Sequence, residues 1–152
     1  MHYEGIIQQS ISPWRAQIVV VKNDNKRRLC IDYSQTINLF TELDAYPLPR
    51  IDTLVNQMAQ YHVFSTFDLR SAYHQIPISK TDRAYTAFEA CGRLWEFTRI
   101  PFGVTNGVPA FQREMDKLVK EEELNDIFPY LDNITVAGRD QDEHDHTCKT
   151  IA

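Results

Sequence analysis

The sequence is short of the residues that mark several common protein classes. Its 5 glycines form no GxGxxG loop for phosphate, and its 3 cysteines form no CxxC pair for a metal or a redox centre. An odd number of widely spaced cysteines favours reduced thiols inside the cell over a disulfide framework. No signal peptide opens the chain, and no apolar run approaches the ~20 residues of a membrane-spanning helix. We therefore expect an intracellular protein that is not secreted and has no membrane partner.

A basic excess is also missing. The formal net charge of −5 over 152 residues argues against a strongly basic arm for nucleic acid, although a local groove can still be positive. The densest basic run spans residues 22–28, whereas residues 121–123 and 140–145 are acidic. A chain of this length is expected to form one domain that buries roughly 70% of the surface exposed by its unfolded form.

Hydrophobic periodicity predicts an α+β fold. Period-two alternation predicts strands, and apolar residues at i, i+3, i+4 and i+7 predict helices. Mostly antiparallel strands with helices packed on one face make an α+β sheet domain. The Pro-rich stretch 45–49 predicts a joint between a small β lobe with its linker, residues 1–45, and the main sheet, residues 46–152. In chain order, the predicted elements are strands at 17–21 and 28–33 around a turn at 23–25, a helix at 51–58, a strand at 63–68, a hairpin at 84–90 and 94–99 around 91–93, a helix at 108–119, a hairpin at 128–136 and a helix at 140–151.

Two carboxylates are the first candidates for a functional site. Asp68 ends the predicted strand 63–68, and Asp132 with Asn133 forms the predicted two-residue turn of the hairpin at 128–136. Such a turn needs positive φ, which Asn and Asp tolerate better than most residues. If the strand lies beside the hairpin, the two carboxylates converge, and converging carboxylates can hold Mg²⁺ for phosphoryl transfer. Because an acid at a strand end and another in a turn are commonplace, spacing alone favours a purely structural role for both.

Ordered motifs carry a stronger signal than spacing. FDLRSAYHQI at 67–76, IPFGVTN at 100–106 with AFQ at 110–112, and YLDN at 130–133 follow one another along the chain. Together they resemble the catalytic motifs of reverse transcriptases from gypsy-class LTR retrotransposons, whose hairpin motif is Tyr-x-Asp-Asp. The upstream segments that match the fingers and the palm entry of that family are 12–14, 30–33 and 46–51.

The resemblance implies a right-hand polymerase fold that contains the fingers and part of the palm. It implies an RNA-directed DNA polymerase that adds deoxynucleotides to a primer 3′-OH through two Mg²⁺ ions, with Mn²⁺ as a substitute. The expected partners are an RNA or DNA primer–template, a dNTP and the remainder of a Pol polyprotein, including the thumb, RNase H and integrase. Replication intermediates of such elements visit the cytoplasm and the nucleus. Because no thumb follows the catalytic hairpin here, we expect the isolated chain to be a poor polymerase.

The resemblance also assigns residues to roles. By family position, Asp68 and Asp132 are the catalytic, metal-binding carboxylates, and the Leu69 carbonyl is a further metal ligand. Tyr73 matches the aromatic residue that crowds the sugar 2′ position and so favours deoxynucleotides. The other residues expected to contact the nucleotide or the template are Lys22 and Arg28, at the triphosphate, and Phe102 and Gly103, beside the nucleotide and template. The arginine fork suits phosphate, whereas the loop after the lysine is one residue shorter than the usual pattern.

Asn133 departs from the family's second Asp. An amide offers one neutral carbonyl oxygen where a carboxylate offers a negative charge, so we expect weaker metal binding. The minimal pair of carboxylates is intact. The surrounding motifs are also uninterrupted by a stop or a frame loss, which favours a working variant over a decayed copy. The alternative function is a non-catalytic relic of a mobile element with residual nucleic-acid or protein binding. A nucleotide cyclase with a palm domain fits less well, because it leaves the Pro-Phe-Gly and Tyr-Leu-Asp-Asn motifs unexplained.

Four other residues resemble functional groups but are assigned structural roles. His144 and His146 lie two positions apart, which places them on different faces of a helix. This spacing predicts a solvated polar helix rather than a metal cluster. His74 is expected to pack behind the sheet, and Cys91 is expected to be a small residue in a turn.

Overall fold

The computed structural model describes residues 4–23 and 26–150, so the predicted turn at 23–25 lies largely outside the described residues. Within the described part of the chain, no helix is both long enough and apolar enough to cross a membrane. The chain divides into two compact units, each built from two segments: residues 1–44 with 71–107, and residues 45–70 with 108–152. One boundary falls between Asp44 and Ala45, and the segment 71–107 groups with residues 1–44.

The first unit contains a three-stranded sheet in the order β1-β6-β5 and a two-stranded sheet of β2 and β3. Its core is formed by Ala16, Tyr33, Phe88 and Phe97, all of which are buried. The Tyr33 hydroxyl donates to the Thr86 carbonyl over 2.9 Å, which gives the buried phenol a partner. The elements of this unit are β1 (Ile7–Gln9), β2 (Gln17–Asn23), β3 (Lys26–Asp32), α1 (Ile37–Phe40), the 3-10 helices η1 (Ala72–Gln75) and η2 (Arg83–Thr86), β5 (Phe88–Ala90) and β6 (Arg93–Phe97).

The helix η2 replaces the first half of the strand predicted at 84–90. The Thr86 side chain supplies the reason. Its hydroxyl donates to the Arg83 carbonyl over 2.7 Å and accepts the Phe97 N–H over 2.8 Å. A side chain therefore takes the place of a main-chain partner for β6, and the backbone before Phe88 is free to turn.

The hairpin turn of the first unit is Cys91–Gly92, one residue shorter than predicted. Ala90 pairs with Arg93, so Arg93 is the first residue of β6. Cys91 and Gly92 have φ values of +51° and +69°, and positive φ at both positions is what a type I′ turn requires. Cys91 is exposed, as expected of a turn residue.

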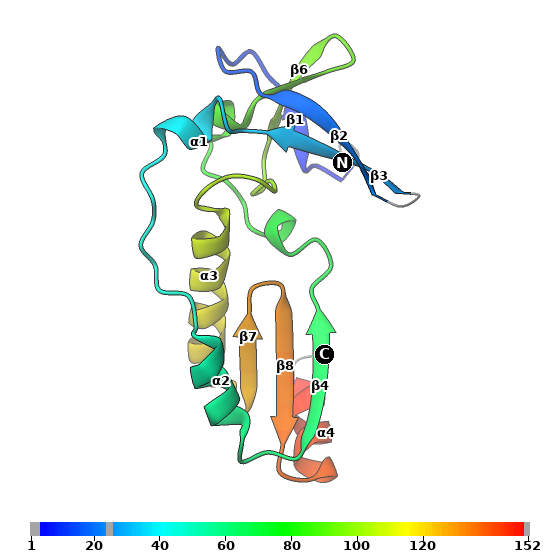
Figure 1. Ribbon diagram of the computed structural model, residues 1–152, viewed down its shortest axis with the longest axis vertical. Helices are drawn as coiled ribbons and strands as arrows, with labels where there is room; N and C mark the ends of the chain where they lie inside the picture. Colours follow the sequence, from blue (N-terminus) through cyan, green and yellow to red (C-terminus); the bar gives the residue numbers. More distant parts are fainter. Residues whose placement is uncertain (1–3, 24–25, 151–152) are drawn as a thin grey trace. The chain divides into compact units, whose positions relative to one another are not determined.

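The second unit is a three-stranded antiparallel sheet in the order β4-β8-β7, accompanied by helices (Figure 1). The predicted helix at 51–58 and the predicted strand at 63–68 are confirmed with their bounds. Helices combined with antiparallel sheets also confirm the α+β class. The elements of this unit are α2 (Ile51–Met58), β4 (Val63–Asp68), α3 (Gly107–Glu121, in this unit from Val108 onward), β7 (Ile127–Tyr130), β8 (Asn133–Gly138) and α4 (Gln141–Thr150).

The turn between β7 and β8 consists of Leu131 and Asp132, so the predicted Asp132–Asn133 turn is wrong. Tyr130 pairs with Asn133, which makes Asn133 the first residue of β8. Leu131 adopts the positive φ, +54°, although Leu disfavours this conformation. A tertiary contact accompanies it, because the Leu131 N–H donates to the Gln112 side-chain carbonyl on α3 over 3.2 Å.

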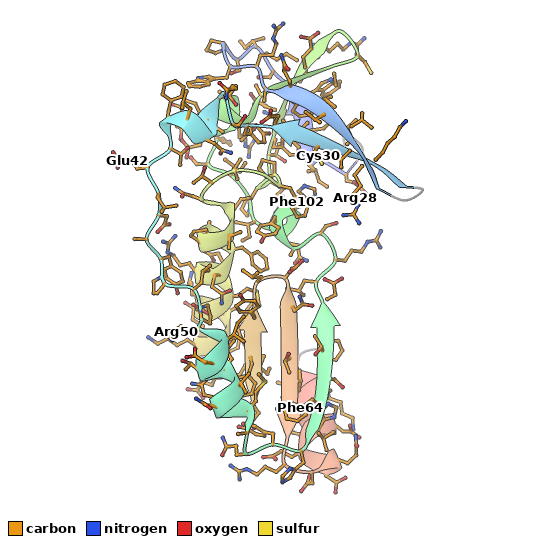
Figure 2. The ribbon with its side chains drawn as sticks, viewed as in Figure 1. Arg28, Cys30, Glu42, Arg50, Phe64 and Phe102 are labelled. Atoms are coloured by element: carbon orange, nitrogen blue, oxygen red, sulfur yellow. The ribbon has the colours of Figure 1, made fainter. Side chains whose placement is uncertain are left out.

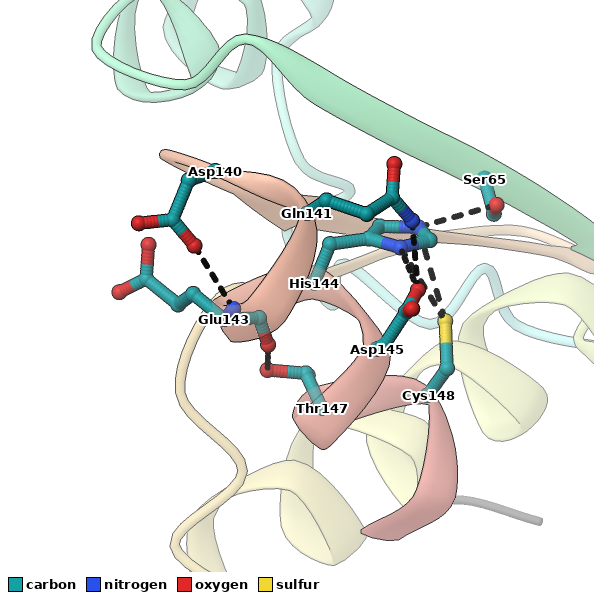
Figure 3. Close-up of polar contacts among 8 residues, drawn as sticks. All are labelled: Ser65, Asp140, Gln141, Glu143, His144, Asp145, Thr147 and Cys148. Atoms are coloured by element: carbon teal, nitrogen blue, oxygen red, sulfur yellow. Dashed lines mark hydrogen bonds and ion pairs between the residues drawn. The ribbon is translucent and has the colours of Figure 1, made fainter.

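Helix α4 packs on one face of this sheet through a buried histidine (Figure 3). His144 is 6% exposed, and its Nε2 lies 3.0 Å from the Ser65 hydroxyl on β4. The prediction of a wholly solvated helix is therefore wrong at His144, although His146 is exposed. Phe64, the neighbour of Ser65, points to the opposite face and is 47% exposed (Figure 2).

Gly138 allows α4 to sit close to β8. A Cβ atom at this position would lie 2.5 Å from the His144 nitrogen and 2.6 Å from its Cβ. The nearest obstacle is backbone, which no change of rotamer can move. A side chain at position 138 would therefore displace the helix.

We expect Gly138→Ala to destabilise the protein by about 1–3 kcal/mol, because overpacking forces α4 away from the sheet. Urea unfolding would show the loss as a lower midpoint. Gly92→Asn is the matched control, since a Cβ at Gly92 meets no atom within 4 Å and Asn tolerates positive φ. Equal midpoints for Gly138→Ala and the parent would contradict this packing.

Candidate active site

The register of β4 and β8 brings Asp68 and the β7–β8 turn to one end of the sheet. Asp68, the last residue of β4, pairs with Asn133, the first residue of β8. One step beyond, the Leu69 N–H donates to the Asp132 carbonyl over 2.9 Å. The strand at 63–68 thus lies beside the hairpin, which is the condition under which the two carboxylates were expected to converge.

Three oxygen-bearing side chains, those of Asp68, Asp132 and Asn133, belong to residues at this end of the sheet. Because Leu69 and Asp132 share a hydrogen bond, the adjacent pair, Asp68 and Asn133, is a non-hydrogen-bonded pair, whose Cβ atoms stand about 4.5–5.5 Å apart. The Asn133 Nδ2 also donates to Asp132 Oδ1 over 3.5 Å. The amide therefore adjoins both acids. Asp68 is exposed and Asp132 is half-buried, so water can reach both carboxylates.

These donors suit a hard cation. The carboxylates of Asp68 and Asp132 and the main-chain carbonyl of Leu69 are oxygen ligands, which Mg²⁺ prefers while it keeps several waters. Nowhere in residues 4–23 and 26–150 do three or more His, Cys, Asp or Glu side chains gather closely enough to hold a metal ion by themselves. A cation at this end of the sheet would therefore depend on two carboxylates, main-chain oxygen and water.

Gln112 lies in the AFQ motif at 110–112, but the sequence assigned it no role of its own. It is fully buried on α3, and its side-chain carbonyl accepts the N–H of Leu131, the residue before Asp132. A signal for it exists in the sequence. Gln112 falls within the apolar stripe of the helix, four residues after Val108 and next to Phe111, and a polar residue at a core position needs a partner.

In the first unit, the predicted nucleotide-side residues Tyr73, Phe102 and Gly103 lie together. The Tyr73 ring meets the Phe102 ring edge-on at a centroid distance of 5.1 Å. Phe102, which is labelled in Figure 2, is an exposed side chain with 57% of its surface accessible. Gly103 has a φ of +91°, and a Cβ there would lie 3.4 Å from the Ile31 carbonyl oxygen, so the loop needs glycine. The two aromatic rings and the glycine loop therefore lie next to one another in this unit.

Asn38 holds this loop in place and was also missed. Its amide nitrogen donates to the Gly103 carbonyl over 2.7 Å, and its amide oxygen accepts the Thr105 N–H over 2.9 Å. One side chain thus satisfies two backbone groups of an irregular loop. An asparagine within a four-residue helix carries no distinctive sequence signal for such a contact.

His74 has a packing role, in agreement with its assignment from the sequence. Its ring stacks on Phe97 at 6.1 Å and meets Phe102 edge-on at 5.4 Å. Burial lowers the pKa of His74 below its ordinary value, which favours the neutral ring. The neutral form is the one that packs against two aromatic rings.

Lys22 and Arg28 do not share a face of the β2–β3 hairpin. Lys22 pairs with Arg27, whereas Arg28 pairs with Val21. Directly paired residues share a face and successive residues alternate, so the Lys22 and Arg28 side chains point to opposite faces of the two-stranded sheet. Both side chains are exposed, and Figure 2 marks Arg28 on β3.

Comparison with known sequences identifies relatives over most of the chain. The reverse transcriptase (RNA-dependent DNA polymerase) family matches residues 12–152. The retrovirus-related Pol polyprotein from transposon gypsy of Drosophila melanogaster is 33% identical over 97% of this chain. Polyprotein P3 of Commelina yellow mottle virus is 33% identical over 83% of it. The chain spans 15% of the first relative and 7% of the second.

Solved structures share the fold. The foamy viral protease–reverse transcriptase in complex with double-stranded DNA matches with a TM-score of 0.87 and 23% identity, over 99% of this chain and 26% of that one. The same viral protein in complex with an RNA/DNA hybrid matches with a TM-score of 0.86 and 23% identity, over 97% and 20%. The expected reverse transcriptase fold and the resemblance to gypsy-class elements are confirmed. The chain belongs to the reverse transcriptase (RNA-dependent DNA polymerase) family.

Proposed function

We propose that the chain is the RNA-directed DNA polymerase domain of a retrotransposon Pol protein, which adds deoxynucleotides to a primer 3′-OH. The observation that carries the proposal is the β4–β8 register, in which Asp68 pairs with the residue that follows Asp132. Membership of the reverse transcriptase family narrows the chemistry to nucleotidyl transfer. Both carboxylates lie at a water-accessible end of the sheet, since Asp68 is exposed and Asp132 is half-buried.

Asp68, Asp132 and the Leu69 carbonyl are the proposed ligands of two Mg²⁺ ions, for which Mn²⁺ can substitute. When bound, the ions activate the attacking hydroxyl and offset the charge on the departing oxygen. The chain contributes one carboxylate at the end of β4 and one in the adjoining β7–β8 turn, and hydrogen bonds such as that from the Leu69 N–H to the Asp132 carbonyl limit the movement of the backbone that carries them.

Tyr73 is the proposed filter against ribonucleotides. Its ring is held edge-on by Phe102, so it cannot easily move aside for an added 2′-hydroxyl. Gly103 follows in a loop that Asn38 anchors, and this loop is proposed to lie beside the nucleotide and template.

Arg28 is the stronger candidate for the triphosphate contact. Lys22 lies on the same face of β2 as Ile18, which packs against the core of the first unit. Arg28 points from the opposite, exposed face, and its planar fork can bind phosphate oxygens in pairs. Arg28 also stands two residues before the segment 30–33, which resembles part of the family's fingers.

The first unit is proposed to be a fingers-like lobe and the second unit part of the palm. The foamy viral relative has been solved with double-stranded DNA and with an RNA/DNA hybrid, and a primer–template with a dNTP is the proposed partner here. Since the chain spans 15% of the gypsy polyprotein, the thumb, RNase H and integrase are proposed to belong to the same larger Pol protein. Its proposed place of action is the cytoplasm or the nucleus.

A non-catalytic relic is the second candidate, and Asn133 is the observation that favours it. A copy released from selection for catalysis could retain its packing while losing an acid of the hairpin motif. The neutral amide weakens the proposed metal site without disturbing the register of β8. Primer extension separates the two candidates.

We expect Asp68→Asn and Asp132→Asn each to reduce primer extension by at least ~10³-fold, because each removes several kcal/mol of charge stabilisation. Deoxynucleotide incorporation on a primed RNA template would be measured with the reverse transcriptase region joined to its downstream segments. Asp142→Asn, an exposed carboxylate in the first turn of α4, is the control and should leave activity unchanged. Equal activity of Asp68→Asn and the parent would refute the metal-site assignment.

We expect Asn133→Asp to lower the metal-free stability by about 0.2–1 kcal/mol at neutral pH, because it places a like charge opposite Asp68. Mg²⁺ should restore the urea midpoint of this variant, and primer extension should be preserved or raised. Thr135→Asp is the control, since Thr135 lies on the same strand but faces Thr66, not a carboxylate. A Mg²⁺ response no larger than that of Thr135→Asp would count against a shared cation.

A further inference from the structure

A chain of hydrogen bonds inside the second unit ends at the turn that contains Asp132. The Tyr46 hydroxyl donates to Asp116 Oδ2 over 2.7 Å. The Gln112 amide nitrogen donates to Asp116 Oδ1 over 2.9 Å. The Gln112 amide oxygen accepts the Leu131 N–H over 3.2 Å. These hydrogen bonds thus connect the extended segment before α2, through two side chains of α3, to the residue before Asp132.

The order of donors and acceptors fixes the Gln112 amide in one orientation. A carboxylate only accepts hydrogen bonds, so Asp116 selects the NH₂ end of the amide. The carbonyl end must then face Leu131, whose backbone offers only an N–H at that point. If the amide were flipped, its NH₂ group would face the Leu131 N–H and its carbonyl oxygen would face the Asp116 carboxylate. Neither hydrogen bond could then form. Because Gln112 is fully buried, such a mismatch would leave buried polar groups without partners, which is costly.

Asp116 is itself oriented from the other side. The hydrogen bond to Asp116 is the main cause of the raised pKa of the Tyr46 hydroxyl, so the phenol keeps its proton and remains a donor. The Arg113 guanidinium lies 4.7 Å from the centre of the Tyr46 ring and packs over its face. Tyr46 is thereby held where its hydroxyl meets Asp116.

Leu131, the last residue in this series of hydrogen bonds, has a backbone conformation that leucine does not adopt readily. Leu131 has a φ of +54°, in a region that glycine favours and where other residues are uncommon. Such a conformation persists when surrounding contacts over-determine it. The bond from Leu131 to Gln112 is a contact of this kind, and the adjoining bond from Leu69 to Asp132 is another.

We propose that Gln112 is a positioning residue for Asp132, oriented by Asp116 and Tyr46. It holds Leu131 in the left-handed conformation and so sets the direction in which the next residue presents its carboxylate. The inference rests on the proposed polymerase function for its catalytic consequence. Its structural part, the restraint of the Leu131–Asp132 turn, stands on the hydrogen bonds alone.

Hydrogen exchange tests the restraint without any need for activity. Gln112→Met keeps the volume of the side chain but removes its acceptor. We expect the Leu131 amide to exchange at least ~10-fold faster in this variant, by NMR, while the Val136 amide in the middle of β8 is unchanged. Gln57→Met, at an exposed position on α2, is the matched control and should change neither amide. Unchanged exchange at Leu131, or equal acceleration at Val136, would overturn the proposal.

Tyr46→Phe provides a second variant that removes one hydroxyl and leaves the buried amide in place. This variant should also accelerate exchange of the Leu131 amide, but by less than Gln112→Met does, since it removes only the hydrogen bond from Tyr46 to Asp116. An unchanged exchange rate of the Leu131 amide in Tyr46→Phe would show that Tyr46 does not help to orient Gln112, and it would overturn that part of the proposal. This variant keeps the proposal testable if Gln112→Met fails to fold.

Kinetics then separate positioning from stability. In the reverse transcriptase region joined to its downstream segments, Gln112→Met should lower kcat for dNTP incorporation by about 10–100-fold with KM for dNTP changed less than about twofold. An unchanged kcat alongside faster Leu131 exchange would overturn the catalytic part of the proposal. If the parent itself does not extend primers, the proposed function fails, and the exchange result still decides the restraint of the turn.

Discussion

The antiparallel register between β4 and β8 is the constraint on which the candidate site depends. Asp68 pairs with Asn133 only in this register, and a slip of one residue would turn Asp68 to the face on which α4 packs. Several contacts oppose such a slip. His144 meets Ser65 on one face, and Val136 and Ala137 in the middle of β8 are fully buried. The position of a single pair of carboxylates is therefore determined by the packing of the whole second unit.

Much of this arrangement was predictable because it is local. The apolar stripe at 51–58 and the alternation at 63–68 specify a helix and a strand without reference to the rest of the chain. The motif containing Asp68 and the motif containing Asp132 point to one site because their order resembles that of a known family. Tertiary contacts need not be known to recognise such features. They are either patterns that repeat with the period of a helix or a strand, or motifs of several residues.

The features of the second unit that escaped prediction depend on tertiary contacts. The turn falls at Leu131 rather than at Asn133, where residue preference would place it, and Gln112 supplies a contact across the unit that accompanies this choice. His144 looked like a surface residue within an acidic helix, yet Gly138 leaves room for it to be buried against β4. In the second unit, Leu131 lies beside the candidate site and His144 helps to hold its sheet. In this unit, a conflict between local preference and observed structure therefore points to residues that support the candidate site.

The most direct test of the account is to ask where a divalent cation binds. Mn²⁺ added in small amounts to the isotope-labelled protein broadens the NMR signals of nearby backbone amides. A shared site on Asp68 and Asp132 predicts that the amides of Leu69, Asp132 and Asn133 broaden first. Strongest broadening in the acidic runs at 121–123 or 140–145, with those three amides unaffected, would show that the two carboxylates do not hold a cation together and would contradict the central claim.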